Sequence, residues 1–486
     1  MKLIKITSMA LIAGYMLVSS GCSRKIDEFG DTNLNPGVVA EPITAALFTN
    51  VLSGMGGEIW SVTLGLYSQL YSETQYTEAS RYARTQADFG GYYSGVLYDC
   101  QNIINYNAAN PEKAAIYGAN VNQIGISRIL KAWWYLRVVD AWGKVPYSEA
   151  LKFDGRIKYD DDQAIYTDLF KELKEGAAQL DASKQTFQGD ILLGGSIAKW
   201  KKFANSIRVI MGIRLAKADP AKGKAELEDA VAGGVIEANS DNVMMAYPGG
   251  NFNSPFYAYY NITQRLDYAV SATLTNFMNP AGDKRVFAYG VAATSNPTIV
   301  KGFPYGLTRN DAIAFNSANP DWSKIMSTAS RTATQPIPIL TASHVYLARA
   351  EAAQRGWNAG GTTSTLYSLG VQRGWEQWGV YNATDFAAYM ANASVALSAG
   401  TEISKIATQR WIAAFPDGQE SWDVWRSTGF PVLVAAPGTT TGIPRRLAIA
   451  QAQFDLNPDH TKTVATAYTV AGELDSQYAR VWWDKP

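Results

Sequence analysis

The segment from Val121 to Leu151 constrains the fold more than any other part of the sequence. Apolar residues recur in it at steps of three and four, the periodicity of an α-helix; they are Ile126, Ile129, Leu130, Trp133, Leu136 and Val139. Trp134 and Trp142 lie off this stripe, so the predicted helix is apolar on more than one side, and such a helix is normally buried. Gly143 is expected to end it, and Pro146 prevents it from resuming. We therefore expect a central helix against which other helices stack.

The composition is that of a folded globular protein. Of 486 residues, 47% are hydrophobic and 18% are charged, which fits neither a disordered nor a membrane-embedded chain. Lysine plus arginine balance aspartate plus glutamate at 43 each, so no net charge attracts the chain to nucleic acid, and we expect no nucleic-acid partner. The length suits about three average domains or one large one.

The first 21 residues have the organisation of a signal peptide. A basic start precedes an apolar run over 6–18, which is too short to span a bilayer. Ser19-Ser20-Gly21-Cys22 then resembles a bacterial lipobox, with serine in place of the usual leucine. In that interpretation Cys22 is the acylated first residue of the mature protein, anchored by about 0.8 kcal/mol per buried methylene. The alternative is an ordinary secretory signal cut near the same position. Cys100 is then a lone thiol, expected to be buried.

Helical periodicity recurs on both sides of two irregular segments. Besides helices over 40–70 and 93–109, it predicts four helix pairs: 121–142 with 160–180, 197–218 with 221–232, 341–356 with 363–378, and 384–394 with 402–415. Residues 72–93 and 248–335 lack this periodicity and are rich in tyrosine, asparagine, arginine and glycine, with strand-like pieces at 282–290 and 301–307. Long irregular segments in compact proteins are commonly functional, so we expect the ligand face there.

The acidic run Asp160-Asp161-Asp162 has two interpretations. It lacks the spaced oxygens and the glycine of a calcium loop. A helix start fits better, with Asp160 as N-cap and Gln163 at the capping-box position.

Motifs for catalysis or metal binding are missing from the sequence. The two histidines, His344 and His460, each lack a neighbouring histidine or cysteine, so no zinc site is expected. Gly194-Gly195-Ser196-Ile197-Ala198 departs from a nucleophile elbow at its last position. Carboxylate pairs for glycoside hydrolysis need separations that a sequence does not show. We expect a protein that is not an enzyme and has no cofactor; a structural calcium ion is not indicated.

The remaining candidates for ligand contact are aromatic residues with nearby asparagine and arginine. Rings stack on sugar rings or peptide side chains, and the polar groups donate hydrogen bonds. The candidates are Tyr76, Arg81 and Tyr82 in the first irregular segment, and Asn251, Phe252, Tyr257, Tyr259, Tyr260, Arg265 and Trp322 in the second. The alternative is that half or more of them pack beneath the loops.

Several motifs resemble the SusD/RagB family of outer-membrane nutrient-binding lipoproteins, and most closely its SusD-like subfamily. They are Asp140-x-x-Gly143-x-x-Pro146-Tyr147-Ser148-Glu149-Ala150, Trp200-x-Lys202-Phe203-Ala204-Asn205-Ser206, and the block from Asp417 to Pro431. The resemblance implies a mainly α, SusD-like fold in a single domain over 22–486. Four tetratricopeptide-type helix pairs, at about 121–232 and 341–425, would carry a loop-rich ligand region with short strands at about 72–93 and 248–335. Arg208, Arg214, Glu420 and Arg426 would make structural ion pairs, the two first-named holding neighbouring loops.

The resemblance also implies a function. The chain would be a lipid-anchored protein on the cell surface that binds an oligosaccharide, or alternatively a peptide. It would pass this ligand to a SusC-like TonB-dependent transporter. Lys25-Ile26-Asp27-Glu28 resembles the surface-export signal of Bacteroidetes lipoproteins. Two other classes stay open: a surface glycoside hydrolase, and a tetratricopeptide-type scaffold that binds only protein.

Overall fold

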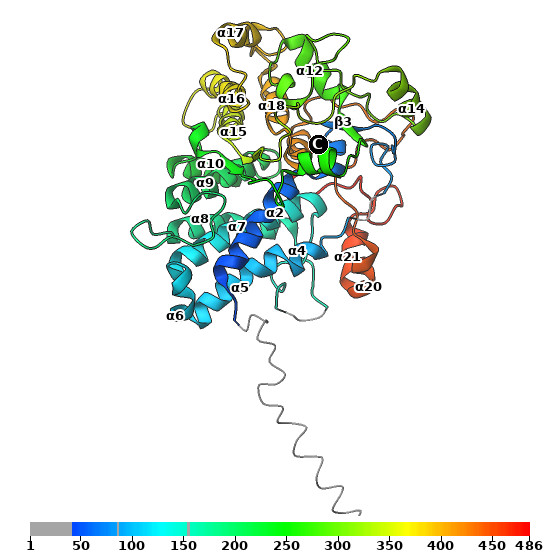
Figure 1. Ribbon diagram of the computed structural model, residues 1–486. Coiled ribbons are helices and arrows are strands. Elements are labelled where there is room, and N and C mark those ends of the chain that lie inside the picture. The colour runs from blue at the N-terminus through cyan, green and yellow to red at the C-terminus, as the bar shows by residue number, and fades with distance from the viewer. Residues whose placement is uncertain (1–40, 85–86, 153–155) are drawn as a thin grey trace, which may run out of the picture. The chain divides into compact units, whose positions relative to one another are not determined.

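The computed structural model describes residues 41–84, 87–152 and 156–486. Contacts divide the chain after Ile43, and Thr44–Pro486 forms one compact unit (Figure 1). The predicted signal peptide and Cys22 lie outside the described residues. Within the part that is described, no helix combines the length and the apolar character needed to cross a membrane.

The compact unit is mainly helical, as predicted. Its first half contains α2 (Thr44–Ile59), α3 (Val62–Tyr67), α4 (Gly90–Ser94), α5 (Val96–Ala109), α6 (Pro111–Ala114), α7 (Asn120–Trp142), α8 (Asp162–Gln179), α9 (Ile197–Arg214) and α10 (Pro220–Ala232). Its second half contains α11 (Pro255–Tyr257), α12 (Ala272–Ala281), α13 (Val286–Tyr289), α14 (Arg309–Ala318), α15 (Ala342–Gln354), α16 (Thr363–Gln377), α17 (Ala383–Ala391), α18 (Glu402–Ala413), α19 (Gly418–Thr428), α20 (Gln451–Leu456) and α21 (Pro458–Ala467). Single turns of 3-10 helix at Ala115–Tyr117 and Asn239–Asp241, and of π-helix at Ala258–Ile262, complete the helical structure.

Two short antiparallel sheets connect segments that are far apart in the sequence. Strand β1 (Tyr71–Glu73) pairs with β3 (Tyr268–Val270). Strand β2 (Val243–Met245) pairs with β4 (Ile337–Leu340). The first sheet places the two predicted irregular segments beside each other. Short strands are present, as expected, but they lie outside the strand-like pieces predicted at 282–290 and 301–307.

Helix α7 is buried along most of its length, as its apolar pattern predicts. Trp133, Trp134 and Trp142 are each at most 5% exposed. The helix packs against α5, α8, α9 and α19. It ends at Gly143, whose φ of 82° favours glycine. Helices α8, α9, α10, α15 and α16 form a row beside it (Figure 1).

Three of the four expected helix pairs are found, and the fourth differs in one member. Helix α7 packs against α8, α9 against α10, and α15 against α16. Helix α18 packs against α15 and α19 rather than forming its main contact with α17, so the predicted pairing of 384–394 with 402–415 is wrong. The reason is burial: α19 is buried at nearly every position, whereas α17 buries only Phe386 and Tyr389.

Two local predictions also need correction. The N-cap of α8 is Asp161, whose side chain accepts a hydrogen bond from the Gln163 amide, rather than Asp160. Asp160 instead accepts from the Tyr147 and Ser148 amides at 3.0 and 2.8 Å and so closes the turn after α7. The strand-like piece at 282–290 contains the helical turn α13.

A buried carboxylate on α7 joins several elements of the core. Asp140 is 1% exposed, and its side chain accepts hydrogen bonds from Tyr166 on α8 and from Trp483 Nε1 at 2.8 Å. It forms an ion pair with Arg214 on α9. Its main-chain carbonyl accepts from Arg426 Nη2 on α19 at 2.7 Å. Burial raises the pKa of Asp140, and the Arg214 guanidinium opposes that shift.

The predicted structural arginines are confirmed in that role. Arg214 also pairs with Glu420 at 2.6 Å, and Arg426 is fully covered beneath the ring of Trp422. Arg208 on α9 pairs with Glu226 on α10 at 2.7 Å. The partners of Arg208 and Arg214 lie on helices, so these side chains fasten helices to one another rather than holding loops.

We predict that Asp140→Asn lowers the free energy of unfolding by about 3 kcal/mol, because it preserves shape but breaks a buried ion pair. Urea denaturation followed by circular dichroism measures this change. The control is Asp385→Asn, at an exposed position in the first turn of α17, which is expected to change stability by less than about 0.5 kcal/mol. Equal stabilities of the two variants would contradict the structural role of Asp140.

Candidate binding site

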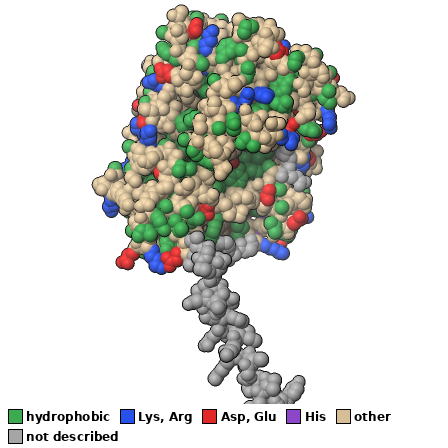
Figure 2. Space-filling model, in the orientation of Figure 1, with side chains coloured by type: hydrophobic (Ala, Val, Ile, Leu, Met, Phe, Trp, Pro, Cys, Tyr) green, Lys and Arg blue, Asp and Glu red, His purple; other side chains and the backbone are tan. Residues whose placement is uncertain are grey.

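The β1–β3 sheet builds one surface from the two predicted loop segments. Glu73 faces Tyr268 in the strand register, and the Thr74 amide donates to the Asp267 carbonyl at 2.9 Å. The visible surface of the molecule carries acidic, basic and hydrophobic side chains intermixed, without a broad patch of one charge (Figure 2). We call the surface around this sheet the loop face, and it has two parts.

The first part is an aromatic patch made of Trp60, Tyr259 and Tyr268, which are half-buried. The centroid of the Trp60 ring lies 5.5 Å from that of Tyr259 and 6.4 Å from that of Tyr268. Beneath them, the buried ring of Phe256 meets Trp60 edge-on at 4.3 Å. Because each ring is supported by another, the patch offers rigid apolar area that is partly exposed.

Polar groups border the aromatic patch around Asp267. Its carboxylate accepts hydrogen bonds from Gln75 Nε2, from Tyr259 Oη at 3.0 Å and from Arg265 Nε at 2.6 Å. Burial alone would raise the pKa of Asp267, but these hydrogen bonds outweigh it and hold the pKa below its usual range. The side chain of Arg265 is 55% exposed. An ionised carboxylate and an exposed donor therefore lie beside the rings.

The second part is a hydroxyl pocket of about 530 Å³. It is lined mainly by hydroxyl-bearing and charged side chains: Thr77, Glu78, Arg81, Tyr82, Thr308, Arg309, Thr439, Thr440, Thr441 and Tyr478. Tyr76 is 45% exposed beside it, and the Arg309 guanidinium carbon lies 5.2 Å from the centroid of its ring. The segment that follows β1 thus contributes to both parts of the loop face.

Two predicted residues of the first segment line the hydroxyl pocket but also hold it together. Arg81 Nη1 donates to the carbonyls of Gly306 and Pro437 at 2.7 and 2.9 Å. Tyr82 is 4% exposed, and its hydroxyl accepts from the Ala436 amide at 3.0 Å. Their contact with a ligand stays a prediction.

The predicted residues of the second segment are dispersed. Tyr259 and Arg265 belong to the aromatic patch and its border. Tyr260 is buried, with its hydroxyl donating to the Tyr268 carbonyl at 2.8 Å. The positions of the others are as follows: Asn251 is exposed in a turn, Phe252 packs on Tyr247, Tyr257 is half-buried in α11, and Trp322 packs on Phe303 with its Nε1 donating to Asn316. Their contact with a ligand also stays a prediction.

Sequence reasoning missed several residues of the loop face, among them Trp60, Tyr268, Gln75 and Tyr478. Trp60 lies directly after α2, and its position before the first irregular segment was a usable signal. Tyr268 belongs to the aromatic-rich run 251–268, whose other tyrosines are all candidates. Gln75 and Tyr478 had no signal, because strand pairing and the return of the C-terminal segment bring them here.

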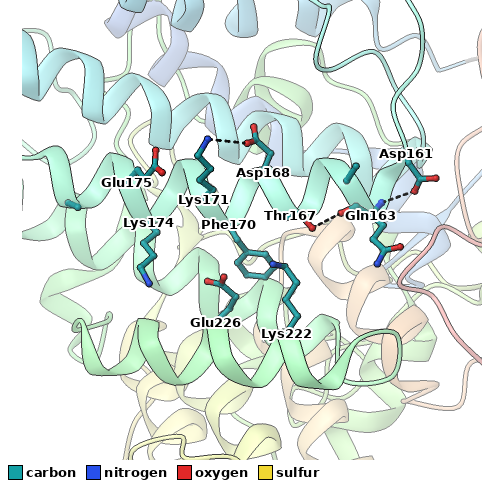
Figure 3. Close-up of a pocket in the computed structure, with 12 residues that line it drawn as sticks. Asp161, Gln163, Thr167, Asp168, Phe170, Lys171, Lys174, Glu175, Lys222 and Glu226 are labelled. Carbon is teal, nitrogen blue, oxygen red and sulfur yellow. Dashed lines mark hydrogen bonds and ion pairs between the residues drawn. The ribbon is translucent and has the colours of Figure 1, made fainter.

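A cavity larger than the hydroxyl pocket lies on the helical scaffold rather than on the loop face. It is a groove of about 990 Å³ between α8 and α10. Figure 3 shows Lys171, Lys174 and Lys222 interspersed with acidic side chains along it. Its aromatic residue, Phe170, is 1% exposed, so the groove offers no ring for stacking, and we do not select it as the ligand site.

His344 and Cys100 both lie in the interior of the protein. His344 is buried, burial lowers its pKa, and Nε2 lies 2.9 Å from the Ala413 carbonyl. Cys100 is a buried free thiol, as expected. Over residues 41–84, 87–152 and 156–486, no three histidine, cysteine or acidic side chains are grouped to hold a metal ion.

One titratable group lies beneath the loop face. Glu73 ends β1 and is 6% exposed, and its Oε2 accepts hydrogen bonds from the Ser80 amide and hydroxyl, both at 2.8 Å. Burial raises the pKa of Glu73 to about 7 despite these hydrogen bonds. The carboxyl therefore keeps its proton to a higher pH than an exposed glutamate does.

We predict a stability change with pH that is specific to Glu73. Between about pH 4.5 and 7 the folded chain holds a proton that the unfolded chain releases, so the free energy of unfolding falls as pH rises. Glu73→Gln removes this dependence, and its stability relative to the parent should increase by about 3 kcal/mol across that range. Urea denaturation at several pH values measures the difference; parallel curves for the two proteins would show that the carboxyl is not perturbed.

Comparison with known proteins places this geometry in a family. A family model described as starch-binding and associating with the outer membrane matches residues 36–449. The chain is similar to the structure of a chitin-binding protein, with 27% identity, a TM-score of 0.77, and coverage of 91% of this chain and 99% of that one. It is also similar to a chitin-binding SusD homologue from Flavobacterium johnsoniae, with 26% identity, a TM-score of 0.75, and coverage of 91% and 98%.

A SusD homologue from Bacteroides uniformis has the same fold, with 23% identity, a TM-score of 0.76, and coverage of 91% of this chain and 99% of that one. None of the curated proteins matches the sequence. These similarities confirm the predicted SusD-like fold. The chain belongs to the SusD-like family of binding proteins, which is described as starch-binding and associating with the outer membrane.

Proposed function

We propose that this chain is a lipid-anchored protein of the cell surface that binds a glycan and passes it, chemically unchanged, to a SusC-like TonB-dependent transporter. Family membership supports glycan binding and association with the outer membrane. The observation that carries the proposal is the aromatic patch, bordered by Asp267 and Arg265 and continued by the hydroxyl pocket.

The chemistry of this surface is complementary to that of a sugar. A pyranose ring has an apolar face of C–H groups that packs on an aromatic ring, and hydroxyls around its edge that donate and accept hydrogen bonds. On the loop face, the Asp267 carboxylate is a hydrogen-bond acceptor and the Arg265 guanidinium is a hydrogen-bond donor, and both groups lie beside the rings. Since internal hydrogen bonds already fix these groups, binding requires little ordering of side chains.

Chitin oligosaccharides are the first ligands to test. Two structures similar to this chain, at 27% and 26% identity, are of proteins named as chitin-binding. We therefore infer N-acetylglucosamine oligomers as the ligand class, ahead of starch fragments. Peptides are the alternative, because aromatic surfaces with polar borders also bind extended peptides.

We predict that Tyr76→Ala and Tyr259→Ala each weaken the binding of N-acetylglucosamine hexamer by about tenfold, the loss of about 1.4 kcal/mol of stacking. Tyr381→Ala is the matched control, since Tyr381 is 41% exposed against 45% for Tyr76 and lies just before α17. Isothermal titration calorimetry measures the affinities, and chromatography of the recovered glycan reports any cleavage.

Three outcomes would overturn the glycan proposal. One is wild-type affinity in both loop-face variants. Another is an equal loss in the Tyr381 control. The last is steady cleavage of the hexamer by the purified protein, which would favour a glycoside hydrolase.

The anchor and the location form a separate prediction. Cys22→Ser removes the thiol that would be acylated. The variant should therefore leave the membrane fraction, because it has no acyl chains to bury in the bilayer. Cell fractionation and protease treatment of intact cells measure attachment and exposure. A variant that stays as firmly membrane-bound and as protease-accessible as the parent would refute the anchor.

A further inference from the structure

We propose that the glycan site of the loop face extends past Tyr478 into a second pocket, which recognises the acetamido group of an N-acetylated sugar unit. The inference rests on the proposed function and adds the part of the ligand that the protein selects. The second pocket, here called the tryptophan pocket, has a volume of about 280 Å³, and its lining includes Trp425, Leu433, Ala435 and Arg445.

The tryptophan pocket and the hydroxyl pocket share a wall. Thr441 and Tyr478 line both of them. A hydrogen bond joins these two side chains, donated by the Thr441 hydroxyl to Tyr478 Oη at 2.7 Å. Because Thr441 is exposed and Tyr478 is half-buried, the shared wall is accessible to a ligand. A glycan in the hydroxyl pocket therefore has the tryptophan pocket next to it.

The volume of the tryptophan pocket indicates a subsite rather than a separate binding site. Pockets that enclose a whole small ligand measure about 300–1,000 Å³. The tryptophan pocket, at about 280 Å³, falls below that range, whereas the hydroxyl pocket measures about 530 Å³. The smaller pocket therefore suits one group of a ligand, and the hydroxyl pocket is the adjoining place for the remainder.

Much of the lining of the tryptophan pocket is apolar. Leu433 and Ala435 are half-buried, and Trp425 is 9% exposed. Along the chain, the two half-buried residues alternate with Val432 and Val434, which are 72% and 76% exposed. Leu433 and Ala435 thus face the pocket while their neighbours face the solvent. An apolar group of the ligand suits this lining, because a polar group without a partner would lose its hydrogen bonds to water.

The polar groups of the tryptophan pocket offer donors to a ligand. Arg445 donates to Asp484 through Nε and Nη2, both at 2.6 Å, and its side chain is 16% exposed. Its Nη1 has no acceptor among the described residues. Tyr478 Oη accepts from Thr441 and, at 3.2 Å, from Gln477 Nε2, and its own proton also has no acceptor in the part of the chain that the structure describes. The residues that line the pocket include no carboxylate.

An acetamido group combines the two properties that this lining requires. Its carbonyl oxygen accepts hydrogen bonds, for which Arg445 and Tyr478 have donors. Its methyl group packs on Leu433 and Ala435. The ion pair with Asp484 balances the charge of Arg445, so the ligand group is a neutral acceptor rather than an anion. A glucose unit has a hydroxyl in place of the acetamido group and leaves the apolar lining in contact with water. The tryptophan pocket therefore selects N-acetylglucosamine units over glucose units.

Two neutral oligomers test this selectivity. They are the N-acetylglucosamine hexamer and the β-1,4-linked glucose hexamer, each titrated calorimetrically into the mature protein and its variants. Ala435→Phe fills the pocket, and Leu433→Asn makes its lining polar. Val434→Phe is the matched control, because Val434 lies between these two positions and is 76% exposed. The melting temperatures of the unliganded variants show whether each one is folded.

We expect the parent and Val434→Phe to bind the N-acetylglucosamine hexamer at least tenfold more tightly than the glucose hexamer. Ala435→Phe and Leu433→Asn should reduce this preference to about twofold or less, by weakening the binding of the acetylated hexamer. If Ala435→Phe does not fold, Leu433→Asn decides, since it changes one half-buried side chain without adding volume.

Two results would overturn the assignment of the tryptophan pocket and leave glycan binding on the loop face intact. One is a folded Leu433→Asn or Ala435→Phe variant with the preference of the parent. The other is equal binding of the two hexamers by the parent. Failure of the parent to bind either hexamer would overturn both the proposed function and its extension into this pocket.

Discussion

The ion pair between Asp140 and Arg214 is the interaction on which the rest of the structure depends. A carboxylate removed from water is strongly unfavourable unless partners replace its hydration. Asp140 obtains those partners from three other elements: Arg214 on α9, Tyr166 on α8 and Trp483 near the C-terminus. Because breaking the pair would leave buried charges uncompensated, the helices around α7 hold one arrangement. The apolar surface of α7 supplies most of the burial, and the charges specify which helix packs where.

Contacts with the helical scaffold hold the loop face in place. The Trp411 indole on α18 donates to the Ser68 carbonyl at 2.9 Å, and the Tyr71 hydroxyl on β1 donates to the Pro416 carbonyl just before α19. These bonds attach the segment that leads into β1 to the α18–α19 pair. Side chains in the loops then form hydrogen bonds with one another, as around Asp267, without a ligand. A surface ordered in this way binds with a small entropic penalty, which suits a shallow site.

Sequence periodicity was sufficient for the helical scaffold but not for the site. Apolar spacing located α7, α8, α9, α15 and α16 to within a few residues, because local burial determines it. Apolar spacing did not predict the pairing of α19 with α18, because that pairing depends on tertiary contacts. The sequence of α19 contributed only to the family resemblance. Composition identified both loop segments, yet it could not separate half-buried Tyr259 from buried Tyr260. The two neighbouring tyrosines differ only in the direction in which the backbone places their side chains. Tyr478 reaches the hydroxyl pocket from a distant part of the chain, and no local pattern encodes such a contact.

The central claim is that a scaffold stabilised by buried charges presents a preformed surface for glycans on its loops. A crystal structure of the protein grown with N-acetylglucosamine hexamer tests it most directly. The account predicts sugar density against Trp60, Tyr259 or Tyr76, with the neighbouring side chains positioned as in the unliganded chain. Hexamer density confined to the groove between α8 and α10, or a loop face that rearranges to form the site, would contradict it.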